Sequence, residues 1–176
     1  MGPKALNQEV IKRVDEGEVY TKSIVDDHQE NKERQQSLKF FITGLHSKNC
    51  SLALKKLSHF EQYKNLVDFI KDSSYDENKN RVYFLLDSKL LLMKMSLSFN
   101  IPRIEKPGVY PFSFDQGIFT NLHGKIHAYE YKNKCLIFSE AQWRGKHTGY
   151  PNLMVEMFSE TLSKISMETM FRLTKL

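Results

Sequence analysis

The sequence predicts an α+β fold: an N-terminal helical arm, an amphipathic helix, an antiparallel β-sheet built from hairpins, and a C-terminal amphipathic helix. Three observations lead to this prediction. The chain has 176 residues, a length typical of one domain. Apolar residues recur with a helical period over residues 50–72 and again from Asn152 onward. Between these stretches they alternate with polar residues, and turn-forming residues separate the alternating segments. Helices on both sides of a block of hairpins are typical of α+β domains.

Residues 1–37 are expected to form a polar arm, helical or flexible, outside a globular body of residues 38–176. Leu6, Val10 and Val14 make one narrow helical stripe. The stretch of residues 26–37 contains no apolar side chain. Because a helix that is polar on all sides has no face to bury, this arm should be solvated, ordered by a partner, or disordered.

An amphipathic helix is predicted over residues 50–72. Its apolar positions, spaced by three or four, are Leu57, Phe60, Tyr63, Val67 and Ile70. Asn49 or Ser51 can cap the first turn, because a short polar side chain satisfies a free backbone N–H there. The polar run over residues 72–80 is expected to end the helix as a loop.

Strands are predicted from Arg81 onward. Two of them flank a turn at residues 87–89, and the second alternates through residues 90–99. Residues 100–117 contain three prolines, so we expect a loop with extended pieces there. The remaining predicted strands cover residues 118–122, 125–131 and 135–141, and the last two are joined by a turn at residues 132–134.

The C-terminal helix is the clearest helical pattern in the chain. Pro151 and Asn152 mark its start, and it contains four of the seven methionines. Methionine is flexible enough to fill a core or to form an adaptable contact surface. We therefore expect this helix to supply a self-association interface. The predicted interface residues are Met154, Met157, Phe158, Met170 and Phe171.

The charge distribution suggests an acidic partner. Residues 1–38 hold 6 basic and 8 acidic side chains, whereas the rest of the chain holds 20 basic and 13 acidic ones. A basic body favours nucleic acid or an anionic lipid surface. Arg144, Lys146 and His147 lie close to two glycines, just before a helix, and are the predicted anion-binding residues.

The cysteine usage indicates a reducing compartment. Cys50 and Cys135 are far apart in the sequence and lack the neighbours of a zinc site, so we expect free thiols in an intracellular protein, cytoplasmic or nuclear. The longest apolar run, residues 90–93, is far too short to cross a bilayer, and the N-terminal residues lack the apolar run of a signal peptide. No transmembrane segment is predicted.

An alternative reading is a metal-dependent nuclease. Asp115 and Glu130 could hold Mg²⁺ or Mn²⁺, with Lys132 stabilising the attacking hydroxide and His123 or His127 as a further ligand. Glu-x-Lys is a common pattern, however, and a solvent-facing charge pair between strands is the favoured explanation. We therefore favour no catalytic residue and no metal.

The function predicted from the sequence is a non-enzymatic structural or interaction protein. It would self-associate, bind an acidic partner through its basic surface and need no cofactor; a small viral structural protein fits this description. A set of aromatic residues could stack bases or form ordinary core, and core is the commoner role. That aromatic set is Tyr110, Phe112, Phe114, Phe119, Tyr129 and Tyr131.

Overall fold

The computed structural model describes residues 6–87, 89 and 94–175, and within these it contains four α-helices and one eight-stranded antiparallel sheet. The predicted α+β class, with helices near both ends of the chain, is confirmed. The elements in chain order are α1 (Gln8–Asp15), β1 (Tyr20–Glu30), β2 (Glu33–His46), α2 (Cys50–Leu57), the short 3₁₀ helix η2 (Phe60–Gln62), α3 (Tyr63–Leu66), β3 (Ile70–Asp76), β4 (Arg81–Leu86), β5 (Met95–Asn100), β6 (Gly108–Gln116), β7 (His123–Tyr131), β8 (Lys134–Lys146) and α4 (Asn152–Leu173).

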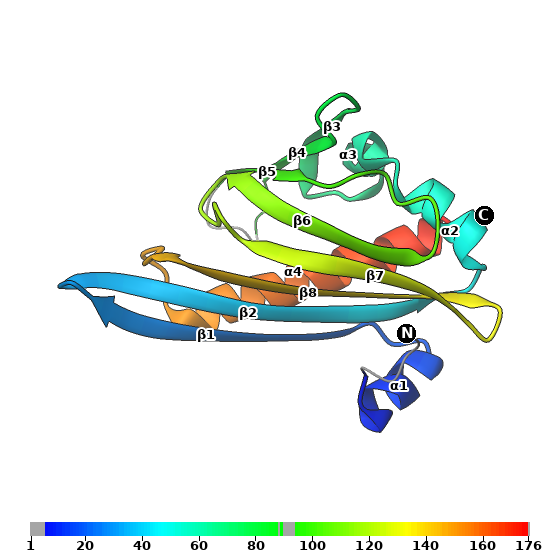
Figure 1. Ribbon diagram of the computed structural model, residues 1–176, viewed down its shortest axis with the longest axis horizontal. Helices are drawn as coiled ribbons and strands as arrows, with labels where there is room; N and C mark the ends of the chain where they lie inside the picture. The colour runs from blue at the N-terminus through cyan, green and yellow to red at the C-terminus, as the bar shows by residue number, and fades with distance from the viewer. Residues whose placement is uncertain (1–5, 88, 90–93, 176) are drawn as a thin grey trace.

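The sheet curls around α4 (Figure 1). The strand order is β1-β2-β8-β7-β6-β5-β4-β3, so β1 and β4 are the first and seventh strands. Both nevertheless contact α4: Ser23 of β1 bonds to Glu160, and Leu86 of β4 shares an apolar cluster with Leu162 and Met170. The face of the sheet turned toward α4 is called the inner face below, and the opposite face is the outer face.

The strand β8 supplies core residues to both faces, because successive side chains of a strand point to opposite sides. Ile137 packs on the inner face in the same cluster as Phe171 of α4. Leu136 and Phe138 point to the outer face, where α1 covers them with residues such as Val14. The sheet is therefore covered by α4 on the inner face and by α1 on part of the outer face.

Gly44 lets α4 approach β2 closely. A Cβ atom at this position would lie 2.9 Å from Met167 Sδ and 2.9 Å from a ring carbon of Phe171. Any larger residue would push the C-terminal half of α4 away from the sheet. The glycine therefore sets the spacing between the helix and the inner face.

Residues 20–37 form strands, so the predicted helical or flexible arm is wrong beyond α1. The polar segment pairs with itself as a hairpin, with register running from Asp26 opposite Ser37 to Glu30 opposite Glu33. The two residues of the turn, at 31 and 32, have φ of 50° and 67°, which suits a tight two-residue hairpin. Strand pairing satisfies the backbone without requiring an apolar face, which the helical reading did require. The expected boundary at residue 38 falls inside β2.

The single helix predicted over residues 50–72 is also wrong. The chain forms α2, η2 and α3 in turn, and then β3 begins at Ile70 within the run expected to be helix and loop. Ser73 of β3 ties the pieces together, because its Oγ accepts from Lys64 N (3.0 Å) and donates to Glu61 O (2.9 Å). The apolar residues of the predicted stripe still pack on the core, although Leu57 and Tyr63 are only partly buried. They come from three short helical segments and the start of β3 instead of from one helix.

A further difference concerns residues 100–122. Residues 108–116, expected in a loop, form β6, whereas residues 118–121 form a turn instead of a strand. Pro111 is opposite Lys125 of β7, but β5 pairs only with residues Ser113 to Gln116, so the other edge of β6 is unpaired at the proline, which is where a strand tolerates proline best. The predicted strands at 81–86, 125–131 and 135–141 and the terminal helix are confirmed. The strand predicted over residues 90–99 is confirmed from Met95 onward as β5, and residues 90–93 lie outside the described residues.

Cys50 and Cys135 form a disulfide and are not free thiols, which corrects the prediction. Both are fully buried, and the bond links the first residue of α2 to β8. The fold brings together residues that are 85 positions apart, a contact that their spacing could not reveal. The predicted reducing compartment thereby loses its basis, because disulfides persist mainly in oxidising surroundings. None of the helices among the described residues is long and apolar enough to cross a membrane.

Candidate ligand-binding cavity

Two cavities lie between the inner face of the sheet and α4. The first, called the N-terminal lobe, has a volume of about 270 Å³ and lies beside the first half of α4. Its wall includes Phe40 from β2, Phe112 and Phe114 from β6, and Phe158 and Leu162 from α4. The alternation of β6 turns both of its phenylalanines inward, because they are two positions apart.

The second cavity, called the C-terminal lobe, has a volume of about 360 Å³ and lies beside the second half of α4. Ile42 and Ile137 of the sheet and Met167 of α4 form part of its wall. Tyr63 also lines it, and its hydroxyl donates to Leu57 O at 2.7 Å. Burial raises the pKa of Tyr63, so the phenol stays neutral in the physiological range.

Stacked aromatic rings hold the wall of the N-terminal lobe in place. Phe99 and Phe114 stack with ring centroids 5.1 Å apart. Phe119 meets Trp143 edge to face at 5.3 Å, and Trp143 Nε1 donates to Thr120 O at 3.1 Å. Such ring pairs contribute beyond simple burial. The aromatic residues that could have stacked bases are therefore mainly parts of the core and of this wall.

The α4 serines along the cavities have their hydroxyls turned back onto their own helix. Ser159, Ser163 and Ser166 face the lobes, and their hydroxyls donate to α4 carbonyl oxygens one turn earlier. Among the described residues that line either lobe, none carries a charge. The space therefore offers hydrocarbon contact and has few groups that could fix a polar molecule.

Two glutamates fasten the first half of α4 to the edge strand β1. Glu160 Oε1 accepts from Ser23 N (2.5 Å) and from Ser23 Oγ (3.0 Å). Glu156 Oε1 accepts from Val25 N at 2.9 Å. These backbone N–H groups belong to the outermost strand of the sheet, so the helix side chains take the place of a further strand.

A buried histidine fastens the last turn of α4. His46 Nδ1 accepts from Lys48 N (3.1 Å), so Nε2 carries the proton and donates to Thr174 Oγ1 (2.9 Å). The Thr174 hydroxyl donates in turn to Met170 O at 2.6 Å. Burial lowers the pKa of His46, because a charged imidazole would lose its solvation there.

Comparison with known proteins shows the fold and no more. No protein family matches the sequence, and no curated protein does either. The solved structure of TTHA0849 from Thermus thermophilus matches with a TM-score of 0.66 at 8% identity, over 78% of this chain and 97% of that one. Zhui aromatase/cyclase from Streptomyces sp. R1128 matches at 0.62 and 8%, over 89% and 94%. Ara h 8.0201 matches at 0.60 and 11%, over 79% and 98%. Similarity at this level of identity does not transfer an activity.

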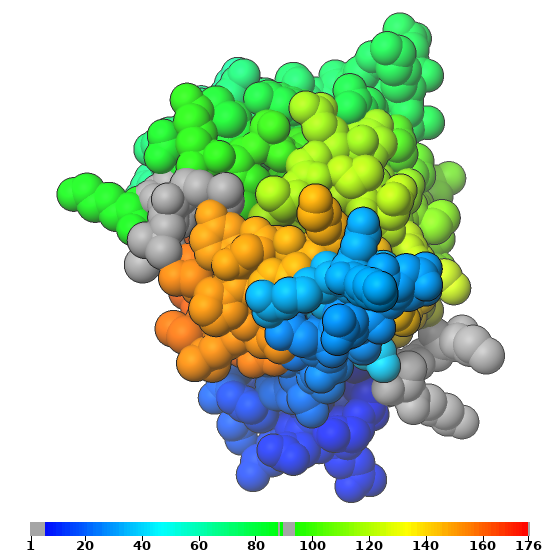
Figure 2. Space-filling view, turned by 90° about the vertical axis from the view of Figure 1, so that its left-hand side faces the viewer, coloured from blue at the N-terminus to red at the C-terminus, as the bar shows by residue number. Residues whose placement is uncertain are grey.

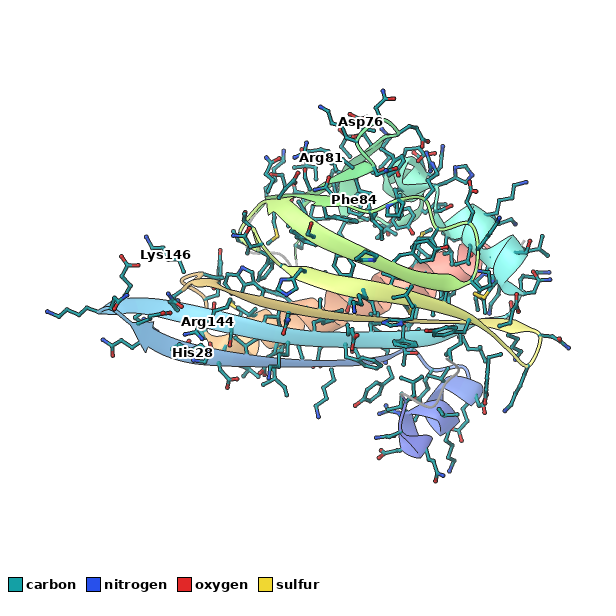
Figure 3. All side chains as sticks on the ribbon, viewed as in Figure 1. His28, Asp76, Arg81, Phe84, Arg144 and Lys146 are labelled. Atoms are coloured by element: carbon teal, nitrogen blue, oxygen red, sulfur yellow. A yellow bond between two sulfur atoms is a disulfide. The ribbon has the colours of Figure 1, made fainter. Side chains whose placement is uncertain are left out.

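The three residues of the nuclease alternative each have another partner. Asp115 receives two bonds from Arg81, at 2.8 and 3.1 Å, and Arg81 lies on β4 (Figure 3). This guanidinium lowers the pKa of Asp115. Glu130 Oε1 accepts from Cys50 N at 2.7 Å. Lys132 Nζ donates to an acceptor on α1, the Asp15 carboxylate, at 2.7 Å, and this bond raises the pKa of Lys132.

The structure does not bring the nuclease residues together. Ser113 of β6 is opposite His123 of β7, and Glu130 is seven residues farther along β7. At about 3.3 Å per residue, Glu130 lies about 23 Å from the end of the hairpin that holds Asp115. Among the described residues, no group of three or more His, Cys, Asp or Glu side chains is placed to hold a metal ion.

The predicted anion-binding residues gather at one end of the molecule, where acidic side chains meet them. Arg144 Nη2 is 3.2 Å from Glu30 Oε2, and His147 Nε2 is 3.3 Å from Asp27 Oδ1. Lys146 is exposed at the same end (Figure 3). Arg144 and His147 therefore face neighbouring carboxylates. The hairpin of β1 and β2, which supplies these carboxylates, lies beside the start of α4 (Figure 2).

The predicted interface residues divide between the surface and the interior. Met157 is 58% exposed, and Met154 is half-buried. Phe158 lines the N-terminal lobe, whereas Met170 and Phe171 are buried within the chain. Only the first part of this set is therefore open to a second copy of the protein.

The cavities were not predicted from the sequence. A signal was present in α4, where small serines stand on the side that faces the sheet, next to large residues such as Phe158 and Leu162. A helix that only filled a core would carry large apolar residues at these positions. Serine at 159, 163 and 166 leaves room between the helix and the sheet.

Proposed function

We propose that this protein binds an apolar small molecule between the inner face of its sheet and α4, and that it does not change that molecule chemically. The observation that carries the proposal is the pair of cavities with walls built mainly from hydrocarbon side chains. Apolar cavities of this kind stay dry and accept apolar guests. Ligand sites are usually concave, mostly apolar and already formed in the free protein.

Binding is better supported than catalysis. One of the structurally similar proteins is named as an aromatase/cyclase. Catalysis by proton transfer needs a titratable group with an accessible proton. Among the described lining residues, the titratable side chains are Tyr63 and Tyr150, and the Tyr63 proton is engaged with Leu57 O. The walls therefore favour a carrier or sensor of an apolar molecule.

The test is binding of an uncharged, apolar fluorescent probe such as N-phenyl-1-naphthylamine. The variant Ser159→Leu places a larger side chain in the N-terminal lobe and should weaken binding at least about tenfold, because the added methylenes occupy the space of the probe. Thr161→Leu adds the same side chain to an exposed position of α4 and is the matched control. Equal probe affinity in all three proteins, or no probe binding to the wild type, would contradict the proposal.

An acidic partner remains a second proposal, and the outer face favours it. On neighbouring strands Lys22 pairs with Phe41, Phe41 with Glu140, and Glu140 with Lys125, so these four side chains lie in one line across the sheet. Lys39 lies two residues from Phe41 along β2, on the same face. The three lysines line an open groove there. If the partner is nucleic acid, replacing them with alanine should flatten the log–log dependence of affinity on salt by about 0.7–0.9 for each lost phosphate contact. An anionic vesicle is the parallel test for a lipid surface.

Self-association and the cellular location stay predictions. Leu153 and Met157 are exposed on α4 and are the apolar residues that a second copy could cover. Sedimentation of the wild type and of Met157→Glu would test this. The disulfide between Cys50 and Cys135 favours an oxidising compartment over the intracellular location that the sequence suggested.

A further inference from the structure

We infer that the two lobes form one elongated site and that its ligand is an unbranched hydrocarbon chain running along α4 through both. This inference rests on the proposed function and specifies the class of ligand. A compact apolar molecule would fill one lobe, whereas a chain would need both.

The lobes meet end to end at two serines. Ser139 of β8 and Ser163 of α4 line both cavities. Along β8, Ala141 lines the N-terminal lobe, Ser139 lines both, and Ile137 lines the C-terminal lobe. The inward side chains of this strand therefore pass from one lobe to the other in sequence order.

The same order holds along α4. Val155 and Ser159 line the N-terminal lobe, Ser163 lines both, and Met167 and Phe171 line the C-terminal lobe. From residue 155 to residue 171 the helix rises about 24 Å. The site is thus long and follows the helix axis, a shape that suits a chain better than a fused ring system.

The residues shared by the two lobes are both serines. Serine is small, and the Ser163 hydroxyl donates to Ser159 O (2.5 Å) and Glu160 O (3.1 Å) of its own helix. Its methylene and the neighbouring apolar groups are what a guest would meet. A methylene chain can pass between two serines, and a larger residue at either position would separate the lobes.

Chain length is the first test, and it uses the wild type alone. Displacement of N-phenyl-1-naphthylamine by n-octanol, n-dodecanol and n-hexadecanol should show affinity rising about fourfold for each added methylene, up to the chain that fills both lobes. A compact alcohol such as adamantanol should bind like the short chains. Affinity that stops rising at n-octanol would overturn the inference while leaving the proposed function intact.

The second test closes the junction. Ser163→Leu should weaken n-hexadecanol at least about tenfold more than n-octanol, because only the long chain needs the passage. Thr161→Leu controls for the added leucine, and circular dichroism confirms that each variant is folded.

The outcomes separate the two proposals. If no alcohol and no probe binds the wild type, both the proposed function and the inference are wrong. If both alcohols bind but Ser163→Leu affects them equally or not at all, the single long site is wrong and the apolar cavity stands. Selective loss of the long chain supports both.

Discussion

The two ends of α4 are fastened to the sheet in different ways. At its C-terminal end, called the anchored end, Phe171 is buried against β2 and β8, His46 bonds to Thr174, and the disulfide of Cys50 lies in the same core cluster as Phe171. At its N-terminal end, called the polar end, Glu156 and Glu160 bond to the edge strand and the neighbouring hairpin is charged. The first end is held by burial beside a disulfide that links α2 to β8, and the second by polar contacts together with the buried Val155.

This difference predicts a gradient of stability along the helix. Buried apolar contacts and cross-links are expensive to break, whereas hydrogen bonds near water exchange for bonds to solvent. The N-terminal lobe therefore lies beside the more easily opened end, and the C-terminal lobe lies deep in the rigid one. Each prediction below removes one fastening, and the effects are expected to decrease in the order given.

The largest effect should come from the disulfide. Cys50→Ala with Cys135→Ala releases a loop of 85 residues and should lower the free energy of unfolding by about 4 kcal/mol, because the unfolded chain regains the conformations that the bond excluded. Urea unfolding of the variant measures this. Dithiothreitol added to the wild type should produce a similar loss, and equal stability of the oxidised and reduced protein would contradict the prediction.

The fold class, four strands and α4 were predictable because their signals are local. The turn between β7 and β8, for example, needs two residues with positive φ, and Lys132 and Asn133 adopt 51° and 61°. Apolar alternation and helical periodicity likewise act over a few residues. These features do not depend on what the rest of the chain does.

The features that were predicted wrongly depend on contacts between segments that are far apart in the sequence. The polar stretch of residues 26–37 becomes regular only because β1 and β2 pair, and β2 pairs in turn with β8. The disulfide needs α2 to begin beside β8, and the cavities need the sheet to curl around α4. None of these contacts leaves a periodic pattern in the sequence. The cavities were therefore not predicted, although several of their lining residues, such as Phe112, Phe114 and Phe158, stood out in the sequence.

The second largest effect should come from Phe171 at the anchored end. Phe171→Ala should cost about 3 kcal/mol, since it removes a buried ring that packs on Gly44 and His46 and leaves a cavity. Leu173 lies two residues farther along α4 and is 37% exposed, so Leu173→Ala should lower the free energy of unfolding by less than about 1 kcal/mol. Thermal unfolding of both variants checks the contrast, and similar losses would refute the idea that burial anchors this end.

The third effect is a pH dependence that His46 imposes. Burial lowers its folded pKa below the ordinary value of about 6.5, so the unfolded state binds the proton more readily. The stability that neutral His46 contributes is fully present above about pH 6.5. It is lost as the pH falls toward the folded pKa, at no more than about 1.4 kcal/mol per pH unit.

The variant His46→Asn isolates this contribution. Asparagine can still accept the Lys48 N–H bond but does not titrate, so the difference in stability between wild type and variant should shrink as pH falls below about 6.5. Denaturant unfolding at several pH values measures the difference. A difference that stays constant with pH would show that His46 does not couple protonation to folding.

A smaller effect is expected from the glutamates of the polar end. Glu160→Gln keeps an oxygen acceptor for Ser23 but removes the charge that strengthens its two bonds, so we expect a loss of about 1 kcal/mol. Hydrogen exchange should quicken at the amides of Ser23 and Val25. Exchange should not change at the amide of Ile137 on β8, which lies in the core cluster of Phe171 at the anchored end. Uniformly faster exchange would mean that the two ends open together.

The smallest effect should come from the charged tip of the polar end. Arg144 is about half exposed, and its pair with Glu30 at 3.2 Å is open to solvent and salt. Exposed pairs of this kind contribute little, because side-chain ordering and screening offset the attraction. Arg144→Ala should therefore change the free energy of unfolding by less than about 0.5 kcal/mol, and less still in high salt. Urea unfolding at low and high ionic strength measures this. A loss comparable to that of Phe171→Ala would show that the polar end is anchored as firmly as the other.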